Sequence, residues 1–276
     1  MGATPAAAPH GARRTRRRRC LGVRGAVFGA CLLWLLLPGA AAAPERPSLR
    51  LGVSASGPPL AFFDQGVLRG LAVELAQALA EALDQELQVQ EMPEARLANA
   101  LRGGRIDLMI STLPQTDLDA LGLAASAALF QSGQMALIRA ADIGRFRRSV
   151  DIITTSARVG YQQGTAGARF VQSRMPTAQQ VPFADVIDGI AALRQGDIDL
   201  FIHDAPTIWA VATDAAEEQL LGMFQPLSQA RAAWTVRAED QRLLSDIDRV
   251  VQQWRDSGRL SRMVNRWMPV RIEVAD

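Results

Sequence analysis

The sequence contains no lysine, and every strongly basic residue is an arginine. Schiff-base chemistry and lysine-based acid/base catalysis are therefore excluded. Cysteine is almost as scarce, because only Cys20 and Cys31 occur and both lie within the first 43 residues. We expect those residues to be absent from the mature protein, which would leave it without a disulfide, a catalytic thiol or a cysteine metal site.

The positive charge is concentrated near the start of the chain. The stretch RRTRRRRC (residues 13–20) carries six arginines and is followed by the apolar run GAVFGACLLWLLLPGAAAA (25–43). This order is typical of a secretory signal peptide, so we expect residues 1–43 to be cleaved and the rest to work in the periplasm. A membrane-anchored form is the alternative, since the apolar run is about long enough to span a bilayer. The basic residues therefore do not indicate nucleic-acid binding.

From Ser48 onward, short apolar runs alternate with helical stretches. Leu71, Leu75, Leu79 and Leu83 recur every four residues, which predicts an amphipathic helix over 70–85. Strands alternating with helices predict parallel sheets. The expected strands are 49–53, 87–92, 106–111, 157–161, 179–183 and 198–204, and the other expected helices are 94–104, 166–175 and 186–196.

Two segments of the chain repeat each other. ALRGGRIDLMIST (100–112) and ALRQGDIDLFIHD (192–204) share Ala-Leu-Arg, a glycine and Ile-Asp-Leu. The match predicts one supersecondary unit used twice, with chance similarity as the alternative. Since ligands of open α/β sheets bind beyond the carboxyl ends of the strands, Ser111-Thr112 and His203-Asp204 are expected to face one cleft.

Several motifs, taken in order, resemble the type II periplasmic solute-binding proteins of the amino-acid-binding family 3 group. The resemblance implies an α/β, two-lobed Venus flytrap fold, in which each lobe is a mainly parallel sheet flanked by helices and two hinge crossovers join the lobes. Lobe 1 would hold residues 44–138 and 231–276, and lobe 2 residues 139–230. The motifs are LRLGVSASGPPLAFF (49–63), LRGGRIDLMIS (101–111), VGYQQGTAG (159–167), IDLFIHDAPT (198–207) and DSGRLSRMVNRW (256–267).

The resemblance implies a binding protein rather than an enzyme. It would be the extracytoplasmic receptor of an ABC importer, capturing a small polar solute between its lobes without a cofactor or a metal. Its partners would be that small-molecule ligand and an ABC permease in the inner membrane, and the receptor itself would be a monomer. Two alternatives stay open: a ligand-sensing periplasmic module for a receptor or an oxidation system, and a dehydratase-like enzyme on the same fold.

The family's ligand contacts fall on residues of both halves. The Gln-Gly-Thr loop implies contacts to a ligand carboxylate, and Asp204 would pair with a ligand amine. Asp204 can also cap the helix expected after it, where Pro206 suits the first turn. The implied contacts are Ser111, Thr112, Gln163, Gly164, Thr165 and Asp204, with Phe62 and Tyr161 as aromatic walls near strand ends.

The sequence departs from the family where the ligand carboxylate should be clamped. Asp119 stands at the position of the expected arginine, and Glu94 stands where a pocket tryptophan is frequent. A guanidinium binds a carboxylate through two hydrogen bonds that few other groups can provide. Without that arginine, Asp119, Asp204 and Glu94 favour a cationic or amine-bearing ligand. Two alternatives remain: Asp119 is solvated on a helix, or Arg96 or another arginine supplies the clamp from elsewhere.

His203 is one of only two histidines in the chain. Because successive side chains of a strand alternate, we expect it to point away from Asp204 and to pack against its neighbours. The lack of a second histidine or a cysteine nearby argues against a zinc site.

Overall fold

The strand expected at 198–204 is buried on both faces. In the computed structural model, which describes residues 46–223 and 225–268, this segment contains β10 (Leu200–Asp204). Leu200 and Ile202 belong to one hydrophobic cluster, and Phe201 belongs to another on the opposite face. A strand buried in this way has apolar residues at consecutive positions, which explains the unbroken apolar run in the sequence.

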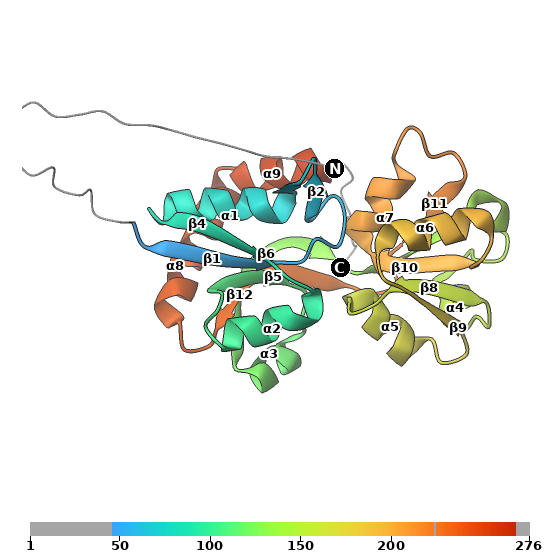
Figure 1. The fold of residues 1–276 in the computed structure, drawn as a ribbon, viewed down its shortest axis with the longest axis horizontal. Helices are drawn as coiled ribbons and strands as arrows, with labels where there is room; N and C mark the ends of the chain where they lie inside the picture. The colour runs from blue at the N-terminus through green and yellow to red at the C-terminus, as the bar shows by residue number, and fades with distance from the viewer. Residues whose placement is uncertain (1–45, 224, 269–276) are drawn as a thin grey trace, which may run out of the picture. The chain divides into compact units, whose positions relative to one another are not determined.

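Lobe 1 is a three-layer unit around a five-stranded sheet with the order β4-β1-β5-β12-β6 (Figure 1). Helices α1 (Leu71–Ala82), α8 (Gln241–Asp256) and α9 (Arg259–Trp267) pack on one face, and α2 (Glu94–Arg102) and α3 (Gln115–Leu121) on the other. The strands are β1 (Ser48–Val53), β4 (Glu86–Glu91), β5 (Leu108–Ser111), β6 (Leu123–Ser132) and β12 (Ala230–Arg237), and a hairpin of β2 (Phe62–Asp64) and β3 (Val67–Arg69) precedes α1.

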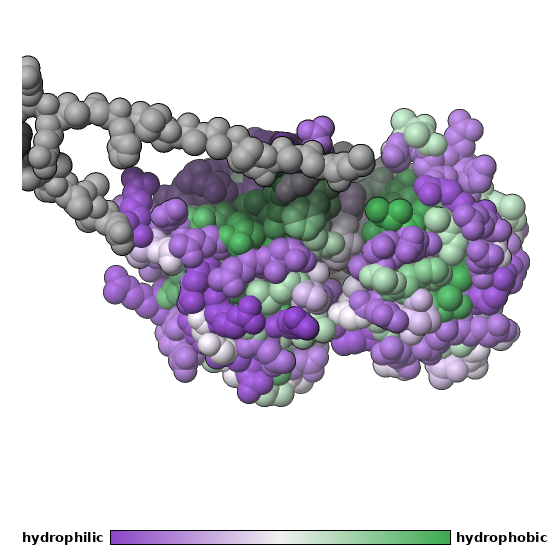
Figure 2. Space-filling model, in the orientation of Figure 1, coloured by the Kyte–Doolittle hydropathy of each residue, from purple (hydrophilic) through white to green (hydrophobic). Residues whose placement is uncertain are grey.

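Lobe 2 repeats this arrangement with the strand order β11-β7-β10-β8-β9. Helices α4 (Ser149–Ile153) and α5 (Ala166–Arg174) lie on one face, and α6 (Val186–Gln195) and α7 (Ala205–Ala212) on the other. Its further strands are β7 (Gln134–Arg139), β8 (Arg158–Gln162), β9 (Gln179–Phe183) and β11 (Leu220–Gly222), and the 3-10 helix η1 (Ala140–Asp142) follows β7. Hydrophilic residues dominate the visible face of the lobes, as expected when helices turn their apolar sides to a sheet (Figure 2).

The expectation of mainly parallel sheets is confirmed. In lobe 1, β1 pairs in parallel with β4 and β5, whereas β12 is antiparallel to both of its neighbours. In lobe 2, β8 pairs in parallel with β9 and β10, whereas β7 is antiparallel to β10 and β11. In each sheet, therefore, one strand opposes the other four, and it is the strand that enters the sheet after the chain crosses between lobes.

The first crossover lies earlier in the chain than expected. The segment 134–138, which we expected to end lobe 1, forms part of β7 and pairs within the sheet of lobe 2. The chain passes between the sheets at Gly133, where a Cβ atom would lie 1.8 Å from the main-chain oxygen of Ser228. Only glycine allows this close passage of the two crossing segments. The second crossover precedes Ala230, next to the expected boundary at 231.

The internal repeat extends to the contacts of its aspartates. Asp107, just before β5, accepts hydrogen bonds from the main-chain N–H (3.0 Å) and Nε (2.9 Å) of Arg50. Asp199, just before β10, accepts the same pair from Arg158, at 2.9 and 3.2 Å. Each arginine lies on the neighbouring parallel strand, so the pair fastens the starts of two strands together in each lobe.

A second arginine completes each cluster. Arg237, which ends β12, donates to the carbonyl oxygens of Leu101 in α2 and Ile106 before β5 at 3.1 and 3.0 Å, and it lies 3.6 Å from Asp107. Arg139, which ends β7, donates to the carbonyl oxygens of Leu193 in α6 and Ile198 before β10 at 2.8 and 2.6 Å, and it lies 3.7 Å from Asp199. The shared geometry favours one unit used twice over chance similarity.

The expected leader, residues 1–43, lies outside the described residues. Within 46–223 and 225–268, none of the helices combines the length and apolar character that crossing a bilayer would need.

Candidate ligand-binding cleft

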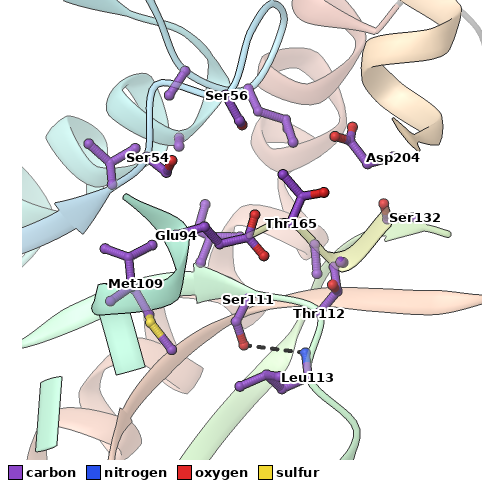
Figure 3. A pocket seen from close by; sticks show the side chains of 18 of the residues that line it. Ser54, Ser56, Glu94, Met109, Ser111, Thr112, Leu113, Ser132, Thr165 and Asp204 are labelled. Atoms are coloured by element: carbon purple, nitrogen blue, oxygen red, sulfur yellow. Dashed lines mark hydrogen bonds between the residues drawn. The ribbon is translucent and has the colours of Figure 1, made fainter. Parts of the chain in front are cut away.

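A cavity of about 330 Å³ lies where the carboxyl ends of strands from both lobes meet (Figure 3). The residues that follow β1 and β5 line it from lobe 1, and those that follow β8, together with the last two residues of β10, line it from lobe 2. All of them belong to one compact unit of the chain, Pro44–Asp276. The position is the one at which open α/β sheets bind small molecules.

Four of the candidate site residues line this common cavity: Ser111, Thr112, Thr165 and Asp204. Figure 3 places the two lobe 1 residues opposite the two lobe 2 residues, with Glu94 between them. The Ser111 hydroxyl forms a hydrogen bond with the Thr235 hydroxyl, with 2.9 Å between the oxygens. This bond holds the Ser111 side chain in place at the end of β5. The two halves thus bring together hydroxyl and carboxylate groups that lie far apart in the sequence.

The other candidate site residues do not line the cavity. For two of them, Tyr161 and Phe62, the side chain packs elsewhere. Tyr161 is only 6% exposed and lies in the hydrophobic cluster between the lobe 2 sheet and α5. Phe62 packs edge-on against Trp267, with 6.1 Å between the ring centroids. Tyr161 therefore faces the interior of lobe 2, and Phe62 packs against α9, which their place near a strand end did not reveal.

Asp119 and the Gln163-Gly164 turn also lie outside the lining. Asp119 is exposed on α3 and accepts a hydrogen bond from Gln115 at 2.8 Å, in line with the solvated alternative. Asp117, two residues earlier on the same helix, lines the cavity instead. Gln163 and Gly164 are exposed in the turn before α5, where Gly164 adopts a φ of 75°.

Thr165 is the N-cap of α5. Its Oγ1 accepts from the N–H of Ala168 at 3.2 Å and donates to the Gln162 carbonyl at 2.8 Å. The cap leaves the first turn of α5, through Ala166 and Gly167, on the cavity wall. Free N–H groups and the positive end of the helix dipole favour a ligand oxygen or anion there.

Asp204 caps α7 and still retains capacity for a ligand. Its carboxylate accepts from the N–H (3.0 Å) and Oγ1 (3.1 Å) of Thr207, and Nδ1 of His203 lies 2.5 Å from Oδ2. A carboxylate has about four acceptor sites, so about one remains for a further donor. Burial alone would raise the pKa of Asp204, but His203 and Thr207 together lower it, so the group is a carboxylate.

The expectation that His203 points away from Asp204 was wrong. Both side chains line the cavity and touch each other, because the strand alternation ends at Asp204, where the chain turns into α7. Nε2 of His203 lies 3.0 Å from Oε1 of Gln162, and the ring stacks on Phe201. The imidazole is therefore held on three sides, and it orients the Asp204 carboxylate.

An ion pair crosses the cavity between the lobes. Nη2 of Arg169 on α5 lies 3.5 Å from Oε1 of Glu94 on α2, and both residues line the cavity. Burial raises the pKa of Glu94, and Arg169, which favours the charged form, offsets only part of that rise. Arg96, considered as a substitute clamp, is exposed and is not a lining residue.

Sequence reasoning missed several lining residues. Ser54 and Ser56 follow β1, so the rule that selected Ser111 could have found them. Gln134 gave no such signal, because its position depends on where the chain crosses between lobes. It is 7% exposed, and its Oε1 faces no donor within the described part of the chain. The same described residues contain no group of three or more His, Cys, Asp or Glu side chains placed to hold a metal ion.

Comparison with known proteins gives consistent matches. The model of the bacterial extracellular solute-binding proteins, family 3, matches residues 49–270. GlnH, an ABC transporter glutamine-binding protein of Bacillus subtilis, is 20% identical over 206 residues, which cover 74% of each chain.

Two solved structures resemble the fold. A mutant of ArgBP from T. maritima, a protein also solved with arginine bound, is 28% identical, has a TM-score of 0.71 and aligns over 81% of this chain and 96% of its own. A binding component of an ABC transporter from Wolinella succinogenes, complexed with lysine, has a TM-score of 0.74 at 19% identity and aligns over 80% and 96%.

Proposed function

Because the chain belongs to the family 3 bacterial extracellular solute-binding proteins, we propose that it captures a small amine-bearing solute between its lobes for an ABC importer. It acts in the periplasm as a monomer and hands the solute to an inner-membrane permease. Ligand contacts from both lobes favour the closed form, which is the form a permease can distinguish.

The observation that carries the choice of ligand is the charge of the cleft. Glu94, Asp117 and Asp204 line it with carboxylates, and Arg169 is the one guanidinium among the described lining residues. Gln134 adds a buried carbonyl oxygen with no donor in the described part of the chain. A ligand that donates N–H groups and carries positive charge satisfies these acceptors, whereas an anion meets repulsion.

The proposal is for binding without chemical change. The relatives described above are named as binding proteins, which supports a receptor over a dehydratase-like enzyme. After incubation with excess protein, the ligand should be recovered unchanged in mass and amount. A product formed over many turnovers would favour the enzyme instead.

A thermal-shift screen, followed by calorimetry, tests the proposal. We expect amino acids with cationic groups, polyamines or simple amines to raise the melting temperature and to bind one per chain. Binding at 100 times Kd stabilises a protein by about 2.7 kcal/mol, which such a scan resolves. If glutamate or other small acids bind and amines do not, the proposed ligand class is wrong.

Affinity for an amine should weaken in acid because of Glu94. The cation needs the ionised carboxylate, whose pKa is raised, so ionisation is lost at a higher pH than for an ordinary glutamate of about 4.3. We expect wild-type affinity to fall as the pH is lowered from about 7, and to do so at a higher pH than an ordinary glutamate would require. Glu94→Gln should bind more weakly at pH 7 but show a flatter profile.

Glu91→Gln is the matched control, because Glu91 is exposed at the end of β4 and does not line the cavity. This variant should keep both the wild-type affinity and the wild-type pH profile. If Glu94→Gln keeps the full wild-type pH dependence, the ionisation of Glu94 does not control binding, and this prediction is wrong.

A further inference from the structure

The cavity has an apolar end that belongs entirely to lobe 1. Leu97 and Met109 line it although they are only 6% and 2% exposed, and both belong to the hydrophobic cluster beneath α2 and α3. We infer that this end is a subsite for an aliphatic chain, so that the ligand is an amine with an apolar tail. The inference rests on the proposed function. The subsite consists of Leu97, Ala98, Met109, Leu113 and Leu121.

Helix α2 joins the charged and apolar ends of the cavity. Glu94 precedes Leu97 and Ala98 by three and four residues, so the three side chains share one face of the helix. The rise of an α-helix separates them by about 5 Å along the axis. A ligand whose ammonium group meets Glu94 can therefore lay a chain of several carbons along the next turn.

Strand β5 indicates the same direction for the ligand's carbon chain as helix α2. Ser111 and Met109 are two residues apart, so both project from the same face of the strand. In Figure 3, Met109 lies on the opposite side of Glu94 from Asp204. The polar contacts thus gather at one end of the cavity, and the carbon chain extends away from Asp204 towards Met109.

An apolar tail suits this end better than a cationic one. The acid beside it is Asp117, which is exposed on α3. An exposed ion pair changes affinity by about fivefold at most, whereas each buried methylene contributes about fourfold. A charge placed against Leu97 and Met109 would also lose its water without gaining a partner.

The aromatic lining does not favour a cationic tail either. Phe130 is the one Phe, Tyr or Trp among the described lining residues. Stacking of a guanidinium or quaternary ammonium between aromatic rings needs more than one such face. Glu94, which stands where the family resemblance leads us to expect a tryptophan, lines the cavity and presents a carboxylate there instead of a second ring.

Two ligand series test the subsite by calorimetry on the purified protein. One contains straight-chain 2-amino acids from alanine to 2-aminooctanoate, and the other contains n-alkylamines of matching length. We expect affinity to rise about fourfold per methylene over the first few carbons. Norleucine should bind more tightly than lysine, which differs from it by a terminal ammonium group.

Ala98→Leu should fill the subsite with little cost to α2, because leucine is a good helix former. Ligands with one- or two-carbon chains should keep their affinity, while norleucine should lose about tenfold or more. Ala82→Leu is the matched control, since Ala82 is exposed at the end of α1, outside the lining. It should leave both series unchanged, and the short-chain ligands report whether Ala98→Leu is folded.

The outcomes separate the two proposals. If members of a series bind with no dependence on chain length, or if lysine binds more tightly than norleucine, the subsite is wrong and the proposed function stands. If Ala98→Leu leaves the affinity for long-chain ligands unaffected, the aliphatic chain of the ligand does not lie in the proposed subsite. If no amine of either series binds, the proposed function fails, and the subsite with it.

Discussion

Asp204→Asn is expected to lower the affinity for the amine ligand about 10- to 150-fold. The lost charge-assisted hydrogen bond is worth about 1.5–3 kcal/mol, and each 1.4 kcal/mol corresponds to a factor of ten. Asparagine caps helices about as well as aspartate, and its oxygen can still accept from the N–H of Thr207. The variant therefore removes the charge while keeping α7 in place, and calorimetry at pH 7 measures the change.

Asp185→Asn is the control for the capping role. Asp185 caps α6, accepts from the N–H of Asp188 at 2.9 Å, and lies outside the cavity lining. The same chemical change there should leave ligand affinity unaltered. Should Asp204→Asn bind as tightly as the wild type, then Asp204 serves only as a helix cap and as the partner of His203, and the ligand amine must meet Glu94 instead.

The sequence predicted the fold well because both lobes follow simple periodicities. The leucines at four-residue spacing form the buried side of α1, where Leu71, Leu75 and Leu79 are fully buried. The repeated Ile-Asp-Leu segments proved to be equivalent strands with equivalent arginine partners. Local patterns of this kind decide which face of an element is buried, so they carry over directly into the structure.

The site was only partly predictable, since it depends on contacts between distant segments. Ser111, Thr112, Thr165 and Asp204 were selected because they end strands or begin helices, and they do line the cavity at the sheet edge. Arg169 lies one turn into α5, where an exposed arginine gives no signal until α2 brings Glu94 opposite. The direction of His203 was misjudged because alternation along a strand does not hold where the chain turns into a helix.

Asp107→Ala is expected to destabilise the protein by about 1.5–3 kcal/mol, the range for a hydrogen bond to a charged group, because its ion pair with Arg50 is partly buried. Asp107 accepts three hydrogen bonds from Arg50 and lies 3.6 Å from Arg237. Its removal therefore takes from Arg50 its carboxylate partner within the described residues, whereas Arg237 keeps Asp240 at 2.6 Å. Asp199→Ala should cost a similar amount, because Arg158 and Arg139 surround Asp199 in the same way. Urea denaturation at pH 7 measures both variants.

The dependence on pH and a surface control separate this effect from a general loss of packing. Burial alone would raise the pKa of Asp107, but the hydrogen bonds and charge of Arg50 lower it overall. Its contribution is therefore complete above the unfolded pKa of about 3.9 and is lost as the pH falls through the lower folded value, so the wild type and Asp107→Ala should converge in acid. Asp246→Ala, which breaks an exposed pair with Arg249, should change stability by less than about 1 kcal/mol. If the difference in the free energy of unfolding between wild type and Asp107→Ala persists unchanged in acid, the effect comes from packing and not from charge.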